Sequence, residues 1–227
     1  MMSKLKMFAF DYDRVLTNSS LTFDYRISPL LKELKKKGAM VGIVTGRRWM
    51  HIEHMKSSVD FIIYENGYFI YISSKNARIK LYERWQEEIA KQMMELLKEN
   101  HISFVKGELL ISIPIEESLR ASKVLEQYMD KLTVVSNIDR IMVLVKNINK
   151  GNALKYAMNY FNVQPSELIV FGDGENDYDM FELSQNAATI GNSINKLKSM
   201  SKLHSDKLYS EGTIELLQKI IDLDLTV

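Results

Sequence analysis

The sequence predicts an α/β fold in which a core domain built on a parallel sheet carries an inserted α+β domain. Short, almost wholly apolar runs alternate with helical segments toward both ends of the chain, which is typical of strands buried between two layers of helices. These runs end in polar residues, and open parallel sheets bind their ligands at that edge. Between about residues 79 and 147 the alternation stops, and this change of rhythm predicts the insert.

The first part of the chain alternates strand and helix. Its most clearly bounded helix has Ser28 as N-cap, Pro29 at the first helical position and Gly38 just after the last turn. Strands flank this helix, and a further helix and strand follow, which gives the ranges 7–10, 40–44, 48–56 and 61–64. The turn from Tyr64 to Tyr68 is expected to start a hairpin and to face the inserted domain.

The inserted segment has a different pattern, in which short strands are grouped around two helices. The helices are expected over 81–99 and 116–131, and the strands over 102–105, 109–113, 133–136 and 141–145, which indicates a small antiparallel sheet. The α/β alternation resumes with a helix over 152–161, a strand over 168–171, a helix over 178–184, a strand over 187–190 and two further helices, the last over 214–221. We therefore expect a core domain of residues 1–78 and 148–227 and an inserted domain of residues 79–147.

Charge and composition exclude several classes of protein. The chain has 30 Lys and Arg against 29 Asp and Glu, so it lacks the basic excess that nucleic acids and anionic membranes attract, and we expect neither as a partner. The absence of cysteine excludes a disulfide framework, thiolate zinc sites and a cysteine nucleophile, and leaves the cytoplasm as the expected location. The apolar run near the N-terminus is too short for a signal peptide, and no membrane-spanning segment is expected.

Two acidic residues, Asp11 and Asp13, follow the first strand directly. Because only one residue separates them, their side chains can face the same crevice at the edge of the sheet. Taken alone, such a pair more often forms an Asx turn that merely ends the strand. A functional interpretation therefore needs a second group of polar residues at the same edge.

A second acidic cluster supplies that group, since Asp173 and Asp177 lie four residues apart in the glycine-bearing turn after the strand 168–171. An EF-hand calcium loop does not fit, because Tyr178 occupies the position that requires glycine and Ser184 the position of the bidentate glutamate. Carboxylates from two strand ends suit Mg²⁺, which keeps waters and a substrate phosphate oxygen in its coordination shell. The sequence therefore predicts Mg²⁺ as cofactor and a small phosphorylated metabolite as partner.

Three further residues are candidates for binding the phosphate. Thr45 follows the second strand, and its hydroxyl and backbone N–H can donate to a phosphoryl oxygen, while Gly46 allows close approach of the backbone. Lys150 opens a helix, where its ammonium and the positive end of the helix both favour an anion. Taken alone, each could be an ordinary turn or surface residue. Their combination with the two acidic clusters favours a role in binding phosphate.

At these residues the chain resembles the haloacid dehalogenase (HAD) superfamily of phosphohydrolases. The superfamily's four motifs occur in order as Asp11-Tyr12-Asp13, Thr45-Gly46-Arg47, Lys150-Gly151, and Gly172-Asp173 with Asn176-Asp177. The insert looks like the α+β (type II) cap of this superfamily, so the resemblance implies a Rossmann-like core under a cap. Leu16-Thr17, Glu65-Asn66-Gly67 and the run 176–181 look most like the archaeal-type phosphoglycolate phosphatases.

The resemblance also implies a role for each motif residue. Asp11 would be the nucleophile that forms an aspartyl-phosphate, and Asp13 would protonate the leaving alcohol and then activate water. The substrate would be bound by Thr45, Gly46, Lys150 and Asn176, and Mg²⁺ by Asp11, Asp173, Asp177 and Asp13, the last through its backbone carbonyl. The implied activity is magnesium-dependent hydrolysis of a phosphomonoester, with 2-phosphoglycolate as the expected substrate and glycolate as the product.

Several alternatives stay open. Sucrose-phosphate and mannosyl-phosphoglycerate phosphatases share much of the pattern, a phosphomutase could use the same core, and a catalytically silent binding module could keep the fold. One departure is Arg14, where the family commonly has glycine; a side chain there would be strained if the backbone required a positive φ. We expect a monomer or a homodimer.

Overall fold

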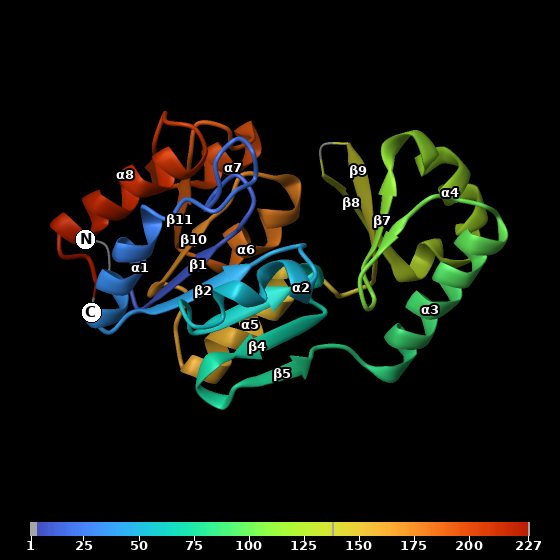
Figure 1. The fold of residues 1–227 in the computed structure, drawn as a ribbon, viewed down its shortest axis with the longest axis horizontal. Coiled ribbons are helices and arrows are strands. Elements are labelled where there is room, and N and C mark those ends of the chain that lie inside the picture. Colours follow the sequence, from blue (N-terminus) through green and yellow to red (C-terminus); the bar gives the residue numbers. More distant parts are fainter. Residues whose placement is uncertain (1–3, 138, 227) are drawn as a thin grey trace.

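The fold is described from a computed structural model, which covers residues 4–137 and 139–226. Residues 1–3, 138 and 227, which the predicted domains include, lie outside the described residues. Two sheets form the molecule, one of eight strands and one of four (Figure 1). The chain passes from the larger sheet to the smaller near residues 81–83 and returns at 146–149. The predicted domain limits stay a prediction.

The larger sheet has the order β12-β11-β10-β1-β2-β3-β4-β5. Its strands from β12 to β3 are parallel, and β4 and β5 are added to that edge as antiparallel hairpins. The α/β prediction is therefore confirmed. The bounds are β1 (Met7–Phe10), β2 (Met40–Val44), β3 (Phe61–Tyr64), β4 (Phe69–Ile72), β5 (Ala77–Lys80), β10 (Leu168–Phe171), β11 (Asn186–Thr189) and β12 (Leu203–His204).

Helices cover both faces of this sheet, which is why its central strands are apolar without alternation. In β1, Phe8 and Phe10 pack toward α1 and α8, whereas Met7 and Ala9 pack toward α5, α6 and α7. All four β1 side chains are fully buried. The helices of this core are α1 (Ile27–Lys36), α2 (Trp49–Ile52), α5 (Lys150–Phe161), α6 (Tyr178–Leu183), α7 (Asn195–Met200) and α8 (Tyr209–Asp222), with 3₁₀ turns at Glu53–Met55, Glu65–Gly67, Ser73–Lys75 and Glu175–Asp177.

The start of α1 differs from the prediction, because Ser28 is not its N-cap. The helix begins at Ile27, and Arg26 is the cap residue without a side-chain cap bond. Asp24 makes the preceding turn, accepting the backbone N–H of Arg26 at 3.1 Å. Pro29 is therefore the third residue of the helix and not, as was predicted, the first. It is tolerated there because the backbone N–H groups of the first turn have no helical partner. The helix end is as predicted, with Gly38 at φ +86° after the last turn.

The smaller sheet is antiparallel, with the order β6-β7-β9-β8. Figure 1 shows its strands on the side toward the core and helices α3 and α4 on the far side. The predicted helix over 116–131 is broken into three pieces, and the predicted strand over 102–105 meets β6 only at Val105. The bounds are α3 (Arg84–Glu99), β6 (Val105–Lys106), β7 (Ile111–Pro114), α4 (Ser118–Val124), β8 (Leu132–Asn137) and β9 (Arg140–Val145), with 3₁₀ turns at Ile115–Glu117 and Glu126–Lys131.

Among the described residues, no helix combines the length and the apolar character that crossing a lipid bilayer requires.

Candidate active site

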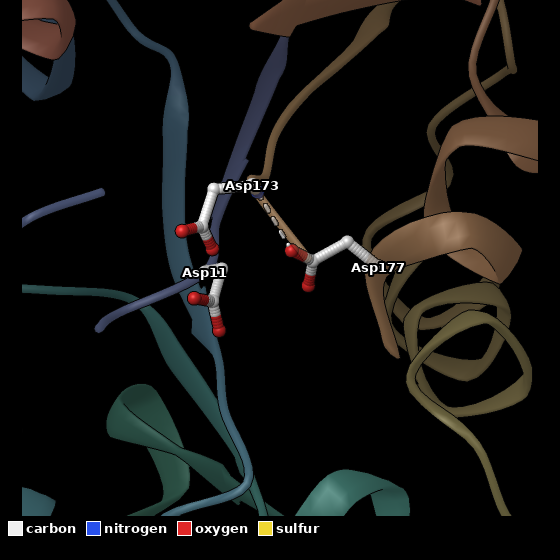
Figure 2. A group of neighbouring side chains, drawn as sticks. All are labelled: Asp11, Asp173 and Asp177. Atoms are coloured by element: carbon white, nitrogen blue, oxygen red, sulfur yellow. Dashed lines mark hydrogen bonds between the residues drawn. The ribbon is translucent and has the colours of Figure 1, made fainter. Parts of the chain in front are cut away.

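Three carboxylates from two adjacent strand ends converge at one edge of the larger sheet. Asp11 follows β1 directly, and its backbone N–H donates to the carbonyl of Phe171 at the end of β10, which fixes the two strand ends side by side. Asp173 follows β10, and Asp177 ends the 3₁₀ turn that comes next. Carboxylate oxygens of Asp11, Asp173 and Asp177 all lie within 4.8 Å of one another (Figure 2).

Lys150 places its ammonium among these carboxylates. The side chain is fully buried at the start of α5, and Nζ donates to Oδ1 of Asp11 at 2.5 Å and to Oδ1 of Asp177 at 2.6 Å. Burial disfavours the charged lysine, but the two carboxylates outweigh this cost and raise its pKa. Lys150 is therefore a permanent cation that neutralises one of the three negative charges.

The turn after β10 fixes the other two carboxylates. Oδ2 of Asp177 accepts the backbone N–H groups of Asp173 at 2.9 Å and Gly174 at 3.1 Å. Gly172 allows this close packing, since a Cβ there would lie 2.7 Å from the Asp177 side chain. Oδ2 of Asp173 accepts from Nδ2 of Asn192 at 2.8 Å. The carboxylates are thus held together by the chain itself.

The electrostatics of this group favour a bound cation. Burial raises the pKa of Asp11 well above its ordinary range, Lys150 lowers it in part, and the neighbouring carboxylates raise it further. Burial and the charge of Asp177 raise the pKa of Asp173 to about 7. Asp11 and Asp177 are buried and Asp173 is half-buried, and these three carboxylates face one ammonium. Oxygen-only ligands of this kind suit Mg²⁺. The residues present therefore fit the metal ion that the sequence implies.

Asp13 is placed differently from the other motif aspartates. Its carboxylate is not part of the converging group but forms a forked ion pair with Arg47, whose Nη2 lies 2.6 Å and Nε 3.0 Å from Oδ1. The Arg47 guanidinium also stacks 4.7 Å from the ring centre of Tyr12. The Asp13 side chain remains 36% exposed, so it faces the cavity described below while Arg47 holds it.

The remaining predicted substrate residues lie around this group. Thr45 is buried after β2, and its hydroxyl accepts the backbone N–H of Arg47 at 3.1 Å. Its carbonyl accepts the backbone N–H of Asn66 at 2.9 Å. Gly46 and Asn176 line the cavity directly, and Asn176 donates to Oδ1 of Asn66 at 3.4 Å. Thr45 is not among the lining residues, so its hydroxyl lies behind Gly46 in this arrangement.

A cavity of about 990 Å³ lies between the core and the smaller sheet and is lined by part of the predicted site, whereas Lys150 and Asp177 are fully buried and do not line it. The core contributes Asp11, Asp13, Gly46, Asp173 and Asn176 to its wall. The smaller sheet closes it from the other side, and the Met142 sulfur lies 3.3 Å from where a Cβ of Gly46 would be. The inserted domain therefore forms a cap over the motif residues.

Two residues of this region were missed from the sequence. Asn192, which orients Asp173, lies in the turn three residues after the end of β11, so a strand-end rule that includes the following turn would have found it. Glu65 is 1% exposed, and its carboxylate accepts three backbone N–H groups of the β6–β7 hairpin, from Glu108 at 2.8 Å and from Leu109 and Leu110 at 3.0 Å. Its turn was expected to face the cap, but nothing in the sequence indicates these backbone partners.

Carboxylates at strand ends, a buried ammonium between them and a cap over the cavity are the arrangement of a phosphohydrolase built on an α/β core. The chain belongs to the haloacid dehalogenase-like hydrolase family, whose model matches residues 8–117 and 107–217. Its relatives identify the enzyme class as phosphatase. A phosphoglycolate phosphatase of Sulfurisphaera tokodaii is 25% identical over 223 residues, covering 93% of this chain and 92% of the relative. Phosphoglycolate phosphatase 2 of Saccharolobus solfataricus is 26% identical, covering 94% and 91%.

Solved structures share the whole fold, including the cap. A crystal structure of a Thermoplasma acidophilum protein superposes with a TM-score of 0.81 at 18% identity, covering 98% of this chain and all of that one. A phosphatase of the haloalkanoate enzyme superfamily from Bacteroides thetaiotaomicron has a TM-score of 0.78 at 16% identity, covering 98% and 96%. At these identities the likeness is one of fold.

Proposed function

We propose that the protein is a magnesium-dependent phosphomonoesterase that works through an aspartyl-phosphate on Asp11 and hydrolyses 2-phosphoglycolate to glycolate. The observation that carries the chemistry is the group of Asp11, Asp173 and Asp177 around the Lys150 ammonium, at the floor of a capped cavity. The substrate assignment rests on the two relatives that are phosphoglycolate phosphatases and that cover nearly the whole chain.

Asp11 is placed to attack phosphorus, because it lines the cavity and its carboxylate is fixed by Lys150. A fixed, desolvated carboxylate needs little reorganisation to reach the in-line geometry. Held by Asp11, Asp173, Asp177 and the backbone carbonyl of Asp13, Mg²⁺ would neutralise charge between the anionic nucleophile and the anionic ester. Lys150 would contribute to the same neutralisation through its hydrogen bond to Asp11.

Asp13 would serve as general acid and base, since its carboxylate lines the cavity and stands apart from the group formed by Asp11, Asp173 and Asp177. In the structure the Arg47 guanidinium occupies the Asp13 carboxylate with a forked ion pair. A substrate phosphate offers Arg47 a competing anion, which would release Asp13 to protonate the leaving alcohol and then to accept a proton from water. Gly46 and Asn176 would border the phosphoryl oxygens, and Thr45 would support this segment from within the core.

The cavity volume favours a second candidate for the substrate. About 990 Å³ is far more room than 2-phosphoglycolate fills and lies at the upper end of ordinary ligand pockets. A larger ester, such as a sugar phosphate or a phosphoglycerate derivative, would fit the same site and use the same residues. The chemistry on Asp11 is common to both candidates.

The test is phosphate release with and without Mg²⁺ from 2-phosphoglycolate, sugar phosphates, mannosyl-phosphoglycerate and an aryl phosphate. Asp11→Asn keeps the shape of the nucleophile, and we expect it to lower kcat by at least about 10³-fold. Asp222→Asn, at an exposed position at the end of α8, is the matched control and should keep full activity.

Preference for 2-phosphoglycolate by tenfold or more in kcat/KM supports the substrate assignment, and preference for another ester replaces it. An Asp11→Asn variant as active as the parent would exclude the aspartyl-phosphate mechanism. A requirement for a bisphosphate activator would indicate a phosphomutase.

A further inference from the structure

The cavity contains more positive charge than the phosphate site needs. Four arginines line it, and Arg47 is paired with Asp13. The other three, Arg14, Arg48 and Arg140, form no ion pair with any described residue. Arginine is seldom kept at a partly closed cavity without an anionic partner, because its desolvation is then uncompensated. These guanidiniums are therefore candidates for binding the part of the substrate that does not react.

Arg140 is the one that the cap supplies. It begins β9, two residues before Met142, so both side chains leave the same face of the strand. The register pairs Ser112 with Met142, and Ser112 therefore shares this face. All three line the cavity, and Met142 lies directly over Gly46. Arg140 is thus about 7 Å along the strand from a residue that contacts the phosphate-binding segment.

The Arg140 side chain is held in one orientation by its neighbour on β7. Nε donates to Oγ of Ser112 at 2.7 Å, and Nη2 donates to the Ser112 carbonyl at 2.6 Å. A guanidinium has five N–H groups, and these bonds use two, so three have no acceptor among the described residues. A fixed guanidinium with free donors is preorganised to bind a carboxylate or phosphate with two parallel hydrogen bonds.

Two acidic residues of the cavity could compete for this guanidinium. Asp139 precedes Arg140 in the chain and lines the cavity, but the described part of the chain has no ion pair between them. Glu175 lines the cavity from the core, in the turn that carries Asp177. Neither carboxylate takes the donors that Ser112 leaves free.

We propose that Arg140 binds a second anionic group of the substrate, a carboxylate or a further phosphate, and so selects phosphate monoesters that carry one. The inference rests on the proposed phosphatase function and names the substrate class of the same site. It applies to 2-phosphoglycolate and to larger anionic esters alike, and it places the reacting phosphate on the core and the distal anion on the cap.

The test compares esters that differ only in the distal charge. One pair is 2-phosphoglycolate and ethyl phosphate, and the other is fructose 1,6-bisphosphate and fructose 6-phosphate, so the pairs distinguish a carboxylate from a phosphate. Each is assayed with the parent, with Arg140→Gln, and with Arg120→Gln, an exposed cap arginine paired with Glu117 on the far side of the sheet. Thermal unfolding of each variant reports whether the cap still folds.

We expect the parent to prefer the member with the distal carboxylate or second phosphate in at least one pair, by tenfold or more in kcat/KM. Arg140→Gln should lower kcat/KM for that ester by about 10- to 100-fold, mainly through KM. For the member of the pair that lacks the distal anionic group, the loss should be less than about threefold. Arg120→Gln should change neither. Ser112→Ala keeps the charge of Arg140 and its bond to the residue 112 carbonyl but removes the bond from Nε to the Ser112 hydroxyl. It should therefore shift the same selectivity by a smaller factor, and it provides the test if Arg140→Gln does not fold.

An equal loss on both members of a pair would mean that Arg140 is structural and would overturn the proposal. So would a parent enzyme that hydrolyses both members of each pair equally well, although the phosphatase function would then stand. If the parent hydrolyses no ester at all, the proposed function and this inference both fail.

Discussion

Glu65 is expected to hold the cap on the core, and its removal gives a sharp test of that contact. The carboxylate is buried and accepts the backbone N–H groups of Glu108, Leu109 and Leu110, and a Cβ at Gly107 would lie 2.3 Å from it. Glu65→Ala leaves three donors without an acceptor, two of them in buried surroundings. At about 1–3 kcal/mol for each buried unpaired group, the docked hairpin loses roughly 2–6 kcal/mol.

The hairpin can avoid part of this cost by lifting off the core into water. We therefore expect local opening rather than global unfolding, with amide hydrogen exchange at Leu109 and Leu110 accelerated by at least about 30-fold, which corresponds to about 2 kcal/mol. Exchange in the central strand β1 should be unchanged. Hydrogen exchange read by mass spectrometry or NMR measures both segments in one experiment.

The matched control is Glu53→Ala, an exposed glutamate of the core, which should leave both amides protected. Glu65→Gln keeps one acceptor oxygen but turns an NH₂ group toward the hairpin, so its effect should be intermediate. If the Glu65→Ala amides exchange as slowly as those of the parent, the carboxylate does not hold the hairpin and the reasoning is refuted.

Two further predictions concern charge and backbone strain. Because the pKa of Asp173 is raised from 3.8 to about 7, mainly by burial, the metal-free native state binds more protons than the unfolded state between these values; its unfolding free energy should fall as the pH rises from about 4 to 7. Mg²⁺ should accordingly raise the melting temperature more at pH 8 than at pH 5, and an equal rise would contradict the assignment. Arg14 has φ +62°, so Arg14→Gly should stabilise the protein by about 0.5–1 kcal/mol, seen as a melting temperature about 1–4 °C higher. A lower melting temperature would show that the Arg14 side chain contributes more contacts than its backbone costs.

The parts of the fold that follow from local pattern were predictable. Strands β1, β2, β3 and β10 agree with the prediction to the residue, because burial on both faces makes them continuous apolar runs between polar turns. The hairpin strand β5 was missed, since it lies at the sheet edge, where exposed and partly buried residues alternate over only four positions. Ser28 was wrong as N-cap because Asp24 and Arg26 start the turn earlier, through contacts that a capping pattern does not contain.

The candidate site also has features that the sequence predicted and features that it did not. Asp11, Asp173 and Asp177 converge as strand-end logic predicts, because parallel strands deliver their ends to one edge. The Asp13 ion pair with Arg47 depends on a residue 34 positions away, and the Glu65 contact depends on backbone N–H groups more than 40 positions away. The type of a side chain does not show which distant group will lie near it in the folded chain, so these contacts could be found only from the structure.

The way in which the cap is attached constrains how substrate can enter. Two chain crossings join cap and core, and both are stiffened, since Nε2 of Gln86 donates to the Lys146 carbonyl at 2.9 Å and the Val145 N–H donates to the Tyr68 hydroxyl at 3.1 Å. With only these two crossings the cap could rotate relative to the core about the line that joins them. The Glu65 contact, the Arg78–Glu108 ion pair and the hydrogen bond from Arg48 to the Lys106 carbonyl hold the hairpin away from these crossings and restrict that rotation. If substrate enters by cap rotation, we expect the rate at which these contacts open to set an upper limit on turnover.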